Sequence, residues 1–439
     1  MKKKKALLWK IPLALISIIL AAVLALAAVV AVQGIDGWRE WEEWQKEHVE
    51  GLSFNVPATD KEAYALEMQR TGVDVEQAVK DGVSFNRLRG LITHNSYKQQ
   101  MPAVGSVIFD SLYKFGVGRE GEYEYKFPSL SEQLSSGVMG LELDLSYYSG
   151  KDGDELLFCH VPLLDMNSSA INAGLAVKEI ALWSEANPKH LPIVILLEPK
   201  DVSIPGFRLH GMDNEHLQEF DKLLRDNLGD SLLTPNDMLG GYSDFGALRA
   251  DDGWLPLEQT LGKVIVLLHP GDLTEDYIAL DQSLRTQAMF PAMQWQQGAS
   301  PQASFVLANY PDVAYQNSRQ LLEEQNLIVR TRIDSYPEHS LEDYFYAMNC
   351  GAQWISTDYP PCASNGNEKA ETYCYKLTAR SAVASAKDSV IIVSFDAAGN
   401  ISSSFADGSE ESKFASEFRY VSSFTPTDGS RIITAEIAP

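Results

Sequence analysis

Basic residues, cysteines and long uncharged stretches are all scarce in this sequence, and each shortage narrows what the chain can be. The chain has 439 residues, with 36 Lys and Arg against 60 Asp and Glu, which gives a formal net charge of -24. Because nucleic-acid binding depends on clustered positive charge, this balance argues against a nucleic-acid partner. An acidic surface also repels anionic membranes, so any membrane contact needs another source of attraction.

The few cysteines exclude a common type of metal site. Cys159, Cys350, Cys362 and Cys374 do not have the spacing of a CxxC framework. Cys159 lies in a strand-like run and is predicted to be a buried free thiol. Cys362 and Cys374 lie close together in a polar segment and could pair in an oxidising compartment.

The one long uncharged run is at the N-terminus. It extends from Ile11 to Val32, 22 residues, and a helix needs roughly 20 apolar residues to span a bilayer. A cleaved signal peptide, with an apolar core of about 7–15 residues, is the alternative. The run predicts a single-pass anchor in the cell membrane, with Lys2–Lys5 and Lys10 in the cytoplasm and everything after Val32 outside. With cleavage the protein would be secreted.

Trp38, Trp41 and Trp44 follow this run at intervals of three residues. On a helix they share one broad face. Tryptophan favours the membrane interface, but an amphipathic linker helix that packs on the main domain explains the spacing equally well. The two interpretations stay open.

Short apolar runs then alternate with helical patterns from about residue 85 to 360. Eight runs are strand-like: RLRGLIT, GLELDLSYY, ELLFCH, LPIVILLE, KVIVLLH, ASFVLANY, LIVRTRI and QWIST. Between them lie helical segments, one of which has Ser168 as a candidate cap. This alternation favours a parallel sheet, and eight units favour a closed α/β barrel of the TIM type over a doubly wound open sheet.

The expected organisation has five parts. A TIM-type (β/α)8 barrel is preceded by a transmembrane helix and followed by a small β-rich appendage or tail. The expected boundaries are a basic segment at 1–10, an anchor or uncleaved signal at 11–33, a Trp-rich linker and lead-in at 34–84, the barrel at 85–375 and the appendage at 376–439.

Polar side chains stand at or near the ends of the first four strand-like runs: His94 and Asn95, then Glu142 and Asp144, then His160, then Glu198 and Lys200. In a barrel of this type the C-terminal strand ends build the active site. A single histidine or E-x-D pair is usually structural or solvated. Four successive runs with such groups instead predict a functional site.

The oxygen donors predict a hard cation. Glu142 and Asp144 alternate onto one face of a strand, where two carboxylates repel each other unless a cation or proton joins them. With Glu198 and the Asn95 side-chain carbonyl they form a set that suits Ca2+, with Mg2+ as the alternative.

At this point the sequence resembles a known family. The segments THNSY, LSEQLSSGVMGLELDL, FCHVPLLD, LPIVILLEPKD and GAQWISTDYP are similar to those of bacterial calcium-dependent phosphoinositide-specific phospholipase C, over roughly residues 85–375. The resemblance implies a metal-dependent phosphodiesterase that cleaves phosphatidylinositol-type lipids to diacylglycerol and a (cyclic) inositol phosphate.

The resemblance also implies a role for each residue. His94 would stabilise the transition state and His160 would be the general acid. Glu142 would take the proton from the inositol 2-hydroxyl. Apart from the resemblance, Lys200 and Arg332 are candidate phosphate contacts, since Lys200 follows a strand end and Arg332 alternates with Arg330 onto one strand face. The structural alternatives are a rim lysine and pairing of the arginines with local acids such as Asp334. The residues that would hold Ca2+ are Asn95, Glu142, Asp144 and Glu198.

Two rival functions are weighed against this one. A glycerophosphodiester phosphodiesterase shares the barrel, the E-x-D pair and a late TD-x-P motif, which Thr357, Asp358 and Pro360 satisfy. It normally has His-Arg-Gly after the first strand, where this chain has His94-Asn95-Ser96. The other rival is a non-catalytic module that binds head groups through calcium, against which His160 argues because binding alone needs no general acid.

Overall fold

A computed structural model describes most of the chain between residues 37 and 358, and four strands beyond it. The described residues are 37–114, 125–151, 153–161, 164–203, 208–335, 343, 346–347, 350–358, 390–395, 401–405, 418–424 and 431–437. The predicted anchor, the predicted Cys362–Cys374 pair and much of the last predicted helix lie outside them.

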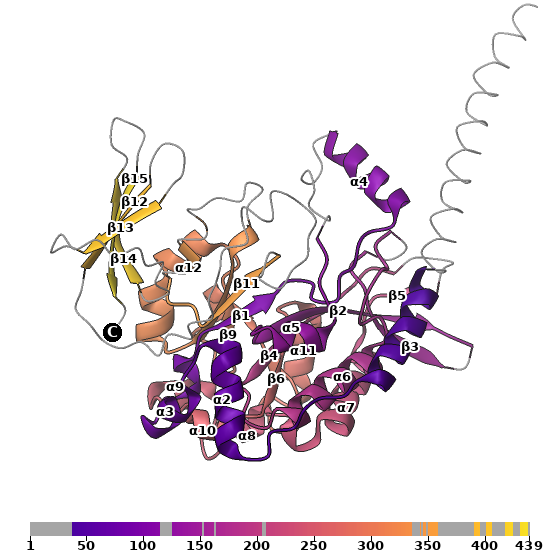
Figure 1. Cartoon of the computed structure of the whole chain (residues 1–439), viewed down its shortest axis with the longest axis horizontal. Helices are drawn as coiled ribbons and strands as arrows, with labels where there is room; N and C mark the ends of the chain where they lie inside the picture. Colours follow the sequence, from indigo (N-terminus) through magenta and orange to yellow (C-terminus); the bar gives the residue numbers. More distant parts are fainter. Residues whose placement is uncertain are drawn as a thin grey trace, which may run out of the picture.

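The centre of the molecule is a nearly closed barrel of parallel strands (Figure 1). Its strands follow the order β7-β6-β4-β2-β1-β11-β10-β9-β8. β7 pairs with β6, and β8 pairs with β9. Only Ala292 separates β7 from β8, so together they fill the eighth strand position. The strands of the barrel are β1 (Gly90–Thr93), β2 (Gly140–Ser149), β4 (Ile193–Pro199), β6 (Val264–Leu268), β7 (Phe290–Pro291), β8 (Met293–Gln294), β9 (Phe305–Leu307), β10 (Ile328–Arg332) and β11 (Trp354–Thr357).

The third predicted strand is real, but it is not a barrel strand. β3 (Asp154–Phe158) pairs antiparallel with β2, from Leu145 opposite Phe158 to Ser149 opposite Asp154. Only four residues join β2 to β3, whereas parallel neighbours need a crossover of about a dozen or more. The run therefore returns along β2 as a hairpin. In the barrel β2 pairs directly with β4, and the eighth strand position is filled by β7 with β8, between β6 and β9.

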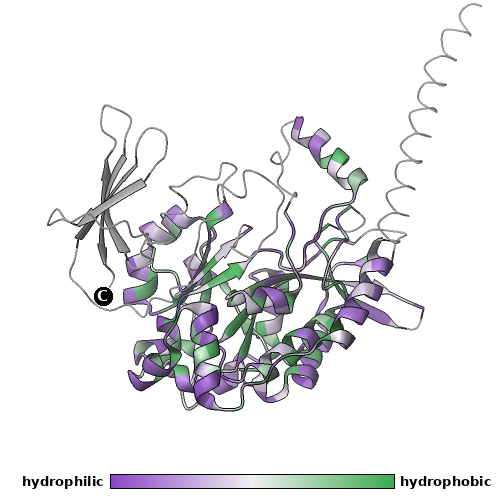
Figure 2. Cartoon of the chain, viewed as in Figure 1, coloured by the Kyte–Doolittle hydropathy of each residue, from purple (hydrophilic) through white to green (hydrophobic). Residues whose placement is uncertain are grey.

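Helices cover the outside of the barrel, with their polar faces turned outward (Figure 2). Their apolar faces pack on the alternate residues of β2 and β4 that point away from the barrel axis. The described helices are 37–51, α2 (Asp60–Thr71), α3 (Val75–Lys80), α4 (Ala103–Lys114), α5 (Leu130–Ser135), α6 (Ala173–Ala186), α7 (Asn214–Leu228), α8 (Pro235–Leu239), α9 (Phe245–Ala250), α10 (Leu257–Thr260), α11 (Asp272–Leu280) and α12 (Pro311–Gln316).

Helix caps are local, and one differs from the prediction. α6 begins after Asn172, whose side chain accepts a hydrogen bond from Leu175 N, and not at Ser168. Ser168 instead lies four residues upstream in a buried bridge with Lys98. α5 has a capping box, in which Ser129 and Glu132 each bind the other's backbone N–H.

The barrel interior changes from apolar to polar along the strands. Its lower layers contain Ile92, Val194, Leu196, Ile265 and Ile328 from the strands around the ring. Gly140 leaves room for this packing, because a Cβ there would lie 2.6 Å from Ile92 Cγ1. Above these layers the inward positions are charged, and they form the site described below.

The helix over 37–51 packs against the β2–β3 hairpin. Trp38 is 1% exposed, and its ring meets Tyr148 edge to face at 4.6 Å. Trp44, in contrast, is 39% exposed. Trp38 therefore packs on the main domain, as the linker-helix interpretation expects.

Two cysteines, the membrane-spanning prediction and the C-terminal strands complete the description of the chain. Cys159 is a buried free thiol, as predicted, and so is Cys350. Within the described part of the chain, no helix has the length and apolar character needed to cross a membrane. Beyond the barrel, β12 (Val390–Phe395), β13 (Ile401–Phe405), β14 (Phe418–Phe424) and β15 (Arg431–Ile437) form an antiparallel sheet in the order β13-β12-β15-β14.

Candidate active site

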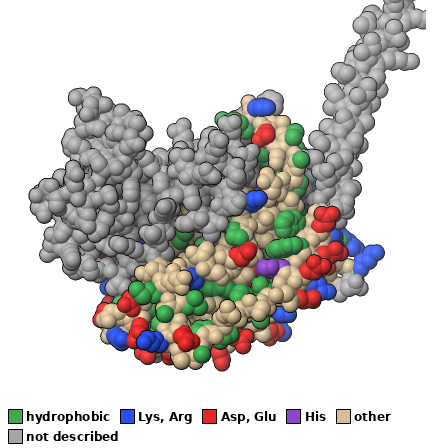
Figure 3. Space-filling model, in the orientation of Figure 1, with side chains coloured by type: hydrophobic (Ala, Val, Ile, Leu, Met, Phe, Trp, Pro, Cys, Tyr) green, Lys and Arg blue, Asp and Glu red, His purple; other side chains and the backbone are tan. Residues whose placement is uncertain are grey.

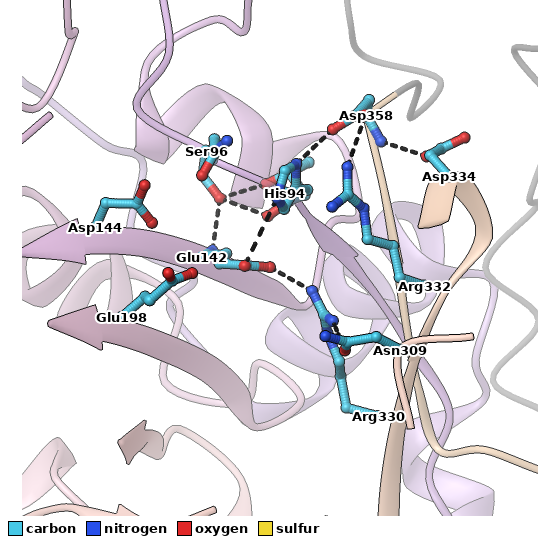
Figure 4. A network of polar contacts seen from close by, with 12 residues as sticks. His94, Ser96, Glu142, Asp144, Glu198, Asn309, Arg330, Arg332, Asp334 and Asp358 are labelled. Carbon is cyan, nitrogen blue, oxygen red and sulfur yellow. Dashed lines mark hydrogen bonds and ion pairs between the residues drawn. The ribbon is translucent and has the colours of Figure 1, made fainter. Parts of the chain in front are cut away.

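The charged side chains at the top of the barrel come from positions that alternate with core residues. On β2, Leu141, Leu143 and Leu145 face the helices, so Glu142 and Asp144 face the interior. The inward-facing charged residues gather at the C-terminal ends of the strands (Figure 4). They are His94 after β1, Glu142 and Asp144 on β2, Glu198 on β4, Arg330 and Arg332 on β10, and Asp358 after β11.

The turn after β1 is fastened to β2. Ser96 N donates to Glu142 O at 2.9 Å, and Glu142 N donates to Ser96 Oγ at 2.8 Å. Asn95 takes a left-handed backbone conformation with φ of 51°, which asparagine adopts more readily than most residues. This geometry explains why His94, Asn95 and Ser96 stand together in the sequence. Asn95 makes the turn, Ser96 fastens it to β2, and His94 is held beside the Glu142 carboxylate.

Glu142 is ion-paired across the barrel. Arg330 on β10 reaches its carboxylate and also donates to Asn309 Oδ1. Both ends of the pair are almost fully buried. Burial alone would raise the pKa of Glu142, but Arg330, His94 and Arg332 lower it to about 2. Glu142 is therefore ionised at neutral pH.

Asp144 and Glu198 share one cation. They are register neighbours on β2 and β4, and Lys200 Nζ lies 2.9 Å from Asp144 Oδ2 and 2.7 Å from Glu198 Oε1. Burial raises the pKa of Asp144, although Lys200 opposes this. Burial would also raise the pKa of Glu198, but Lys200 and His269 lower it overall.

His94 is held by a carboxylate that is itself held on two sides. His94 Nδ1 lies 2.6 Å from Asp358 Oδ1, and Arg332 donates to Asp358 Oδ2 at 3.0 Å. Asp358 N donates to Asp334 Oδ2 at 2.7 Å. Burial would raise the pKa of Asp358, but Arg332 and His94 bring it well below its usual value. His94 Nε2 is left facing Glu142 Oε1 at 3.8 Å.

His160 is placed by the hairpin. Cys159 N donates to Asp144 O at 3.2 Å, which keeps the end of β3 beside the site. His160 Nδ1 lies 3.4 Å from Asp165 Oδ2, and the fully buried Lys98 donates to that same oxygen at 2.7 Å. Each of the two histidines therefore has a buried carboxylate behind it.

The predicted calcium ligands fit calcium in chemistry, and Asp144 fits best. Its carboxylate is buried: Oδ2 has Lys200 Nζ at 2.9 Å, and Oδ1 has no hydrogen-bond partner among the described residues. Asn95 donates through Nδ2 to Tyr125 at 2.8 Å, so its Oδ1 is not used in that bond. No group of three His, Cys, Asp or Glu side chains in the described part of the chain is gathered closely enough to hold a metal. The three carboxylates are held instead by Lys200 and Arg330.

The structure thus brings together the predicted residues His94, Asn95, Glu142, Asp144, His160, Glu198, Lys200 and Arg332. Sequence reasoning named Arg330 only as a possible phosphate contact beside Arg332 and Asp358 only in the TD-x-P motif, and it missed Lys98 and Asp165 altogether. Arg330 and Asp358 had a usable signal, since one alternates with Arg332 on a strand and the other follows the last strand.

A parallel barrel with two carboxylate-backed histidines and an acidic cluster at its C-terminal mouth is suited to cleaving phosphodiesters. The family model for calcium-dependent phosphoinositide phospholipase C matches residues 151–385, more than half of the chain. The chain therefore belongs to the calcium-dependent phosphoinositide phospholipase C family and is a phosphodiesterase that acts on phosphoinositide-type lipids. This confirms the resemblance noted in the sequence. The matched segment includes His160, Glu198, Lys200, Arg330, Arg332 and Asp358, while His94, Asn95, Glu142 and Asp144 precede it.

Two of the solved structures to which the chain is similar are bacterial phospholipases C. A calcium-dependent phosphoinositol-specific phospholipase C from a Gram-negative bacterium, Pseudomonas sp., is 17% identical, with 63% of this chain and 90% of that chain covered and a TM-score of 0.43. A Ca2+-dependent phosphatidylinositol-specific phospholipase C from Streptomyces antibioticus is 19% identical, with 63% and 94% covered and a TM-score of 0.44. No curated protein sequence matches the chain. The family assignment rests on the family model.

Proposed function

We propose that the protein cleaves plain phosphatidylinositol or a similar lipid to diacylglycerol and a cyclic inositol phosphate. The observation that carries this is the pair of histidines, each backed by a buried carboxylate, beside one acidic cluster. Such an arrangement offers one group to take a proton and another to give one, as intramolecular attack on a phosphodiester requires.

His94 is the better base in this proposal. Asp358 accepts from Nδ1, which leaves Nε2 to take the proton of the inositol 2-hydroxyl. Glu142, the base implied by the family resemblance, is engaged by Arg330, and its pKa of about 2 makes it a weak proton acceptor. Glu142 then keeps the roles of ligand and partner of Arg330.

His160 is the general acid. As the inositol oxygen attacks phosphorus and the bond to the glycerol oxygen breaks, His160 donates its proton to that leaving oxygen. Asp165 orients the ring from the Nδ1 side. Arg332 and Lys200 are the candidate phosphate contacts.

Asn95, Glu142, Asp144 and Glu198 would hold calcium. When bound, the ion supplies positive charge that lowers the pKa of the attacking hydroxyl and offsets charge on phosphorus. The N-terminal run would keep the enzyme at the cell membrane with its barrel outside, next to its lipid substrate.

Product analysis tests the proposal. The protein is incubated in detergent micelles with phosphatidylinositol and calcium, and we expect diacylglycerol and cyclic inositol phosphate. Excess chelator should stop the reaction and added calcium should restore it. Full activity in chelator would remove calcium from the proposal, and preference for deacylated glycerophosphoinositol would favour a glycerophosphodiester phosphodiesterase. The His94→Ala, His160→Ala double variant is the control for contaminating activity.

A further inference from the structure

The backbone of Lys200 is held by two hydrogen bonds, whereas its charge lies at the end of a flexible side chain. Its backbone N donates to Leu145 O at 2.8 Å, and its carbonyl accepts from Met212 N at 2.6 Å. The side chain is 19% exposed, whereas Asp144, which it contacts, is fully buried. A lysine carries its charge on a flexible stem of four carbons, so the ammonium group can leave the site while the strand end stays in place.

The ammonium lies where a bridging metal ion would lie. It is within 2.9 Å of one oxygen of Asp144 and 2.7 Å of one oxygen of Glu198, and calcium binds carboxylate oxygens at about 2.3–2.6 Å. The two cations would also repel each other strongly at such a separation. Both cannot occupy the gap between these carboxylates.

Arg330 is paired with Glu142 as closely as Lys200 is with its carboxylates, but it is more deeply buried and has a second partner. Its side chain is 2% exposed, and it is held by Asn309 as well as by Glu142. Removing it would leave a buried carboxylate without its counter-ion. Lys200 is therefore the cation that can be exchanged, and Arg330 is the one that stays.

We propose that Lys200 is a tethered counter-ion that occupies the calcium position between Asp144 and Glu198 and is displaced when calcium binds. The inference rests on the calcium site of the proposed function. Without calcium, the ammonium keeps the two carboxylates from repelling each other. Its displacement weakens the apparent affinity for calcium, because binding must first break two ion pairs.

Calcium titration calorimetry on the full chain in detergent tests this directly. We expect Lys200→Met to bind calcium at least about tenfold more tightly than the unaltered protein, since calcium affinity rises with the uncompensated charge of its ligands. Lys222→Met is the matched control, because it makes the same change in net charge at an exposed lysine paired with Asp226. Its calcium affinity should equal that of the unaltered protein.

A second measurement guards against a folding defect. Calcium should raise the melting temperature of Lys200→Met by more than that of the unaltered protein at the same concentration, and Lys200→Gln should behave like Lys200→Met should the latter fail to fold. Equal or weaker calcium affinity in the folded Lys200 variants overturns the inference. If phosphatidylinositol cleavage still needs calcium in that case, the proposed function stands. If no variant binds calcium, the inference and the calcium site fall together.

Discussion

The two histidines of the site differ in how their carboxylate partners are held. The Asp358 carboxylate accepts a hydrogen bond from Arg332 and lies 2.6 Å from His94, and the Asp358 backbone N donates to Asp334 Oδ2. Asp165 Oδ2 lies 3.4 Å from His160 Nδ1 and also accepts a hydrogen bond from Lys98. The tighter contact suits a ring that must keep one orientation while it accepts a proton.

Removing each histidine should therefore have a different signature. We expect His160→Ala to lower turnover by about 10²–10⁴-fold, which is typical for loss of a general acid. The loss should be much smaller on an inositol phosphodiester with an acidic leaving group such as a nitrophenol, because that group leaves without a proton. His94→Ala should impair both substrates alike. The measurement is kcat on each substrate at saturating calcium.

Calcium binding provides the control for this comparison. His160→Ala should leave calcium affinity unchanged, since its proposed role is proton donation and not ligation. Equal losses on both substrates in His160→Ala would speak against the acid role, and weaker calcium binding would place His160 in the metal site.

The contact between Arg330 and Glu142 shows what the sequence could not predict at this scale. The two residues are 188 positions apart, and nothing in either segment indicates that a guanidinium crosses the barrel. Their strands β2 and β10 are not neighbours in the ring. Strand alternation predicted that Arg330 and Arg332 share a face, but only the closed ring determines which acid each one meets.

Among the elements, β2 decides the form of the site because it extends past its neighbours. It runs to Ser149, and the extra length gives β3 and β5 (Leu209–His210) a strand to pair with. The sequence predicted a strand at each of the eight apolar runs. It assigned the third to the barrel because strand composition does not reveal strand direction. It missed β7 and β8, which have two residues each, too few for a recognisable pattern.

The hairpin still places His160 beside the other predicted residues, for a physical reason. A hairpin that returns along β2 brings its own end to the level of Asp144, as the bond from Cys159 N shows. His160 therefore reaches the site from above the barrel. His160 thus lies beside the other predicted residues, although its strand runs in the opposite direction to the barrel strands.

Two substitutions in the helix over 37–51 can distinguish packing on the main domain from binding at the membrane interface. Trp38→Ala should lower the free energy of unfolding by about 3–5 kcal/mol, as expected for a buried large aromatic ring, because Trp38 is 1% exposed. Trp44→Ala should change it by less than about 0.5 kcal/mol, the usual limit for an exposed position. Chemical denaturation followed by circular dichroism measures both.

Gln45 and His48 anchor the same helix to Asn172 and Glu179. Because both substitutions lie in the same helix, the difference between Trp38→Ala and Trp44→Ala measures how strongly the helix packs on the main domain, and not whether the helix forms. A small effect of Trp38→Ala would mean that the helix is undocked in solution, and the membrane-interface interpretation would then gain. Vesicle binding of Trp44→Ala tests that interpretation separately.

At the scale of the whole molecule, acidic residues outnumber basic ones, with 60 Asp and Glu against 36 Lys and Arg. The formal net charge is -24, and in the view of Figure 3 acidic side chains are prominent along the lower edge, with basic ones between them. At the mouth, in contrast, Lys200, Arg330 and Arg332 each lie against a carboxylate. A substrate thus meets cations that are already paired.

This balance bears on which head group the enzyme takes. Recognition of extra phosphates needs clustered Lys or Arg near the mouth. The fifth predicted strand is β6, and the lysine next to it in the sequence is Lys263. Lys263 precedes β6 and donates to Asp230 O, at the opposite end of the barrel from the site.

We therefore predict that phosphatidylinositol is a better substrate than its 4,5-bisphosphate. The paired arginines would have to give up Glu142 and Asp358 to bind added phosphates, and breaking a buried pair costs about 3–5 kcal/mol. The net charge of -24 adds a long-range repulsion that grows with head-group charge. The measurement is kcat/KM for both lipids in the same micelles at fixed calcium, repeated at higher salt, where the long-range part of the preference should shrink. A tenfold preference for the bisphosphate, roughly 1.4 kcal/mol, would contradict the prediction, and its loss in Arg332→Met would identify Arg332 as the residue that reads the added phosphates.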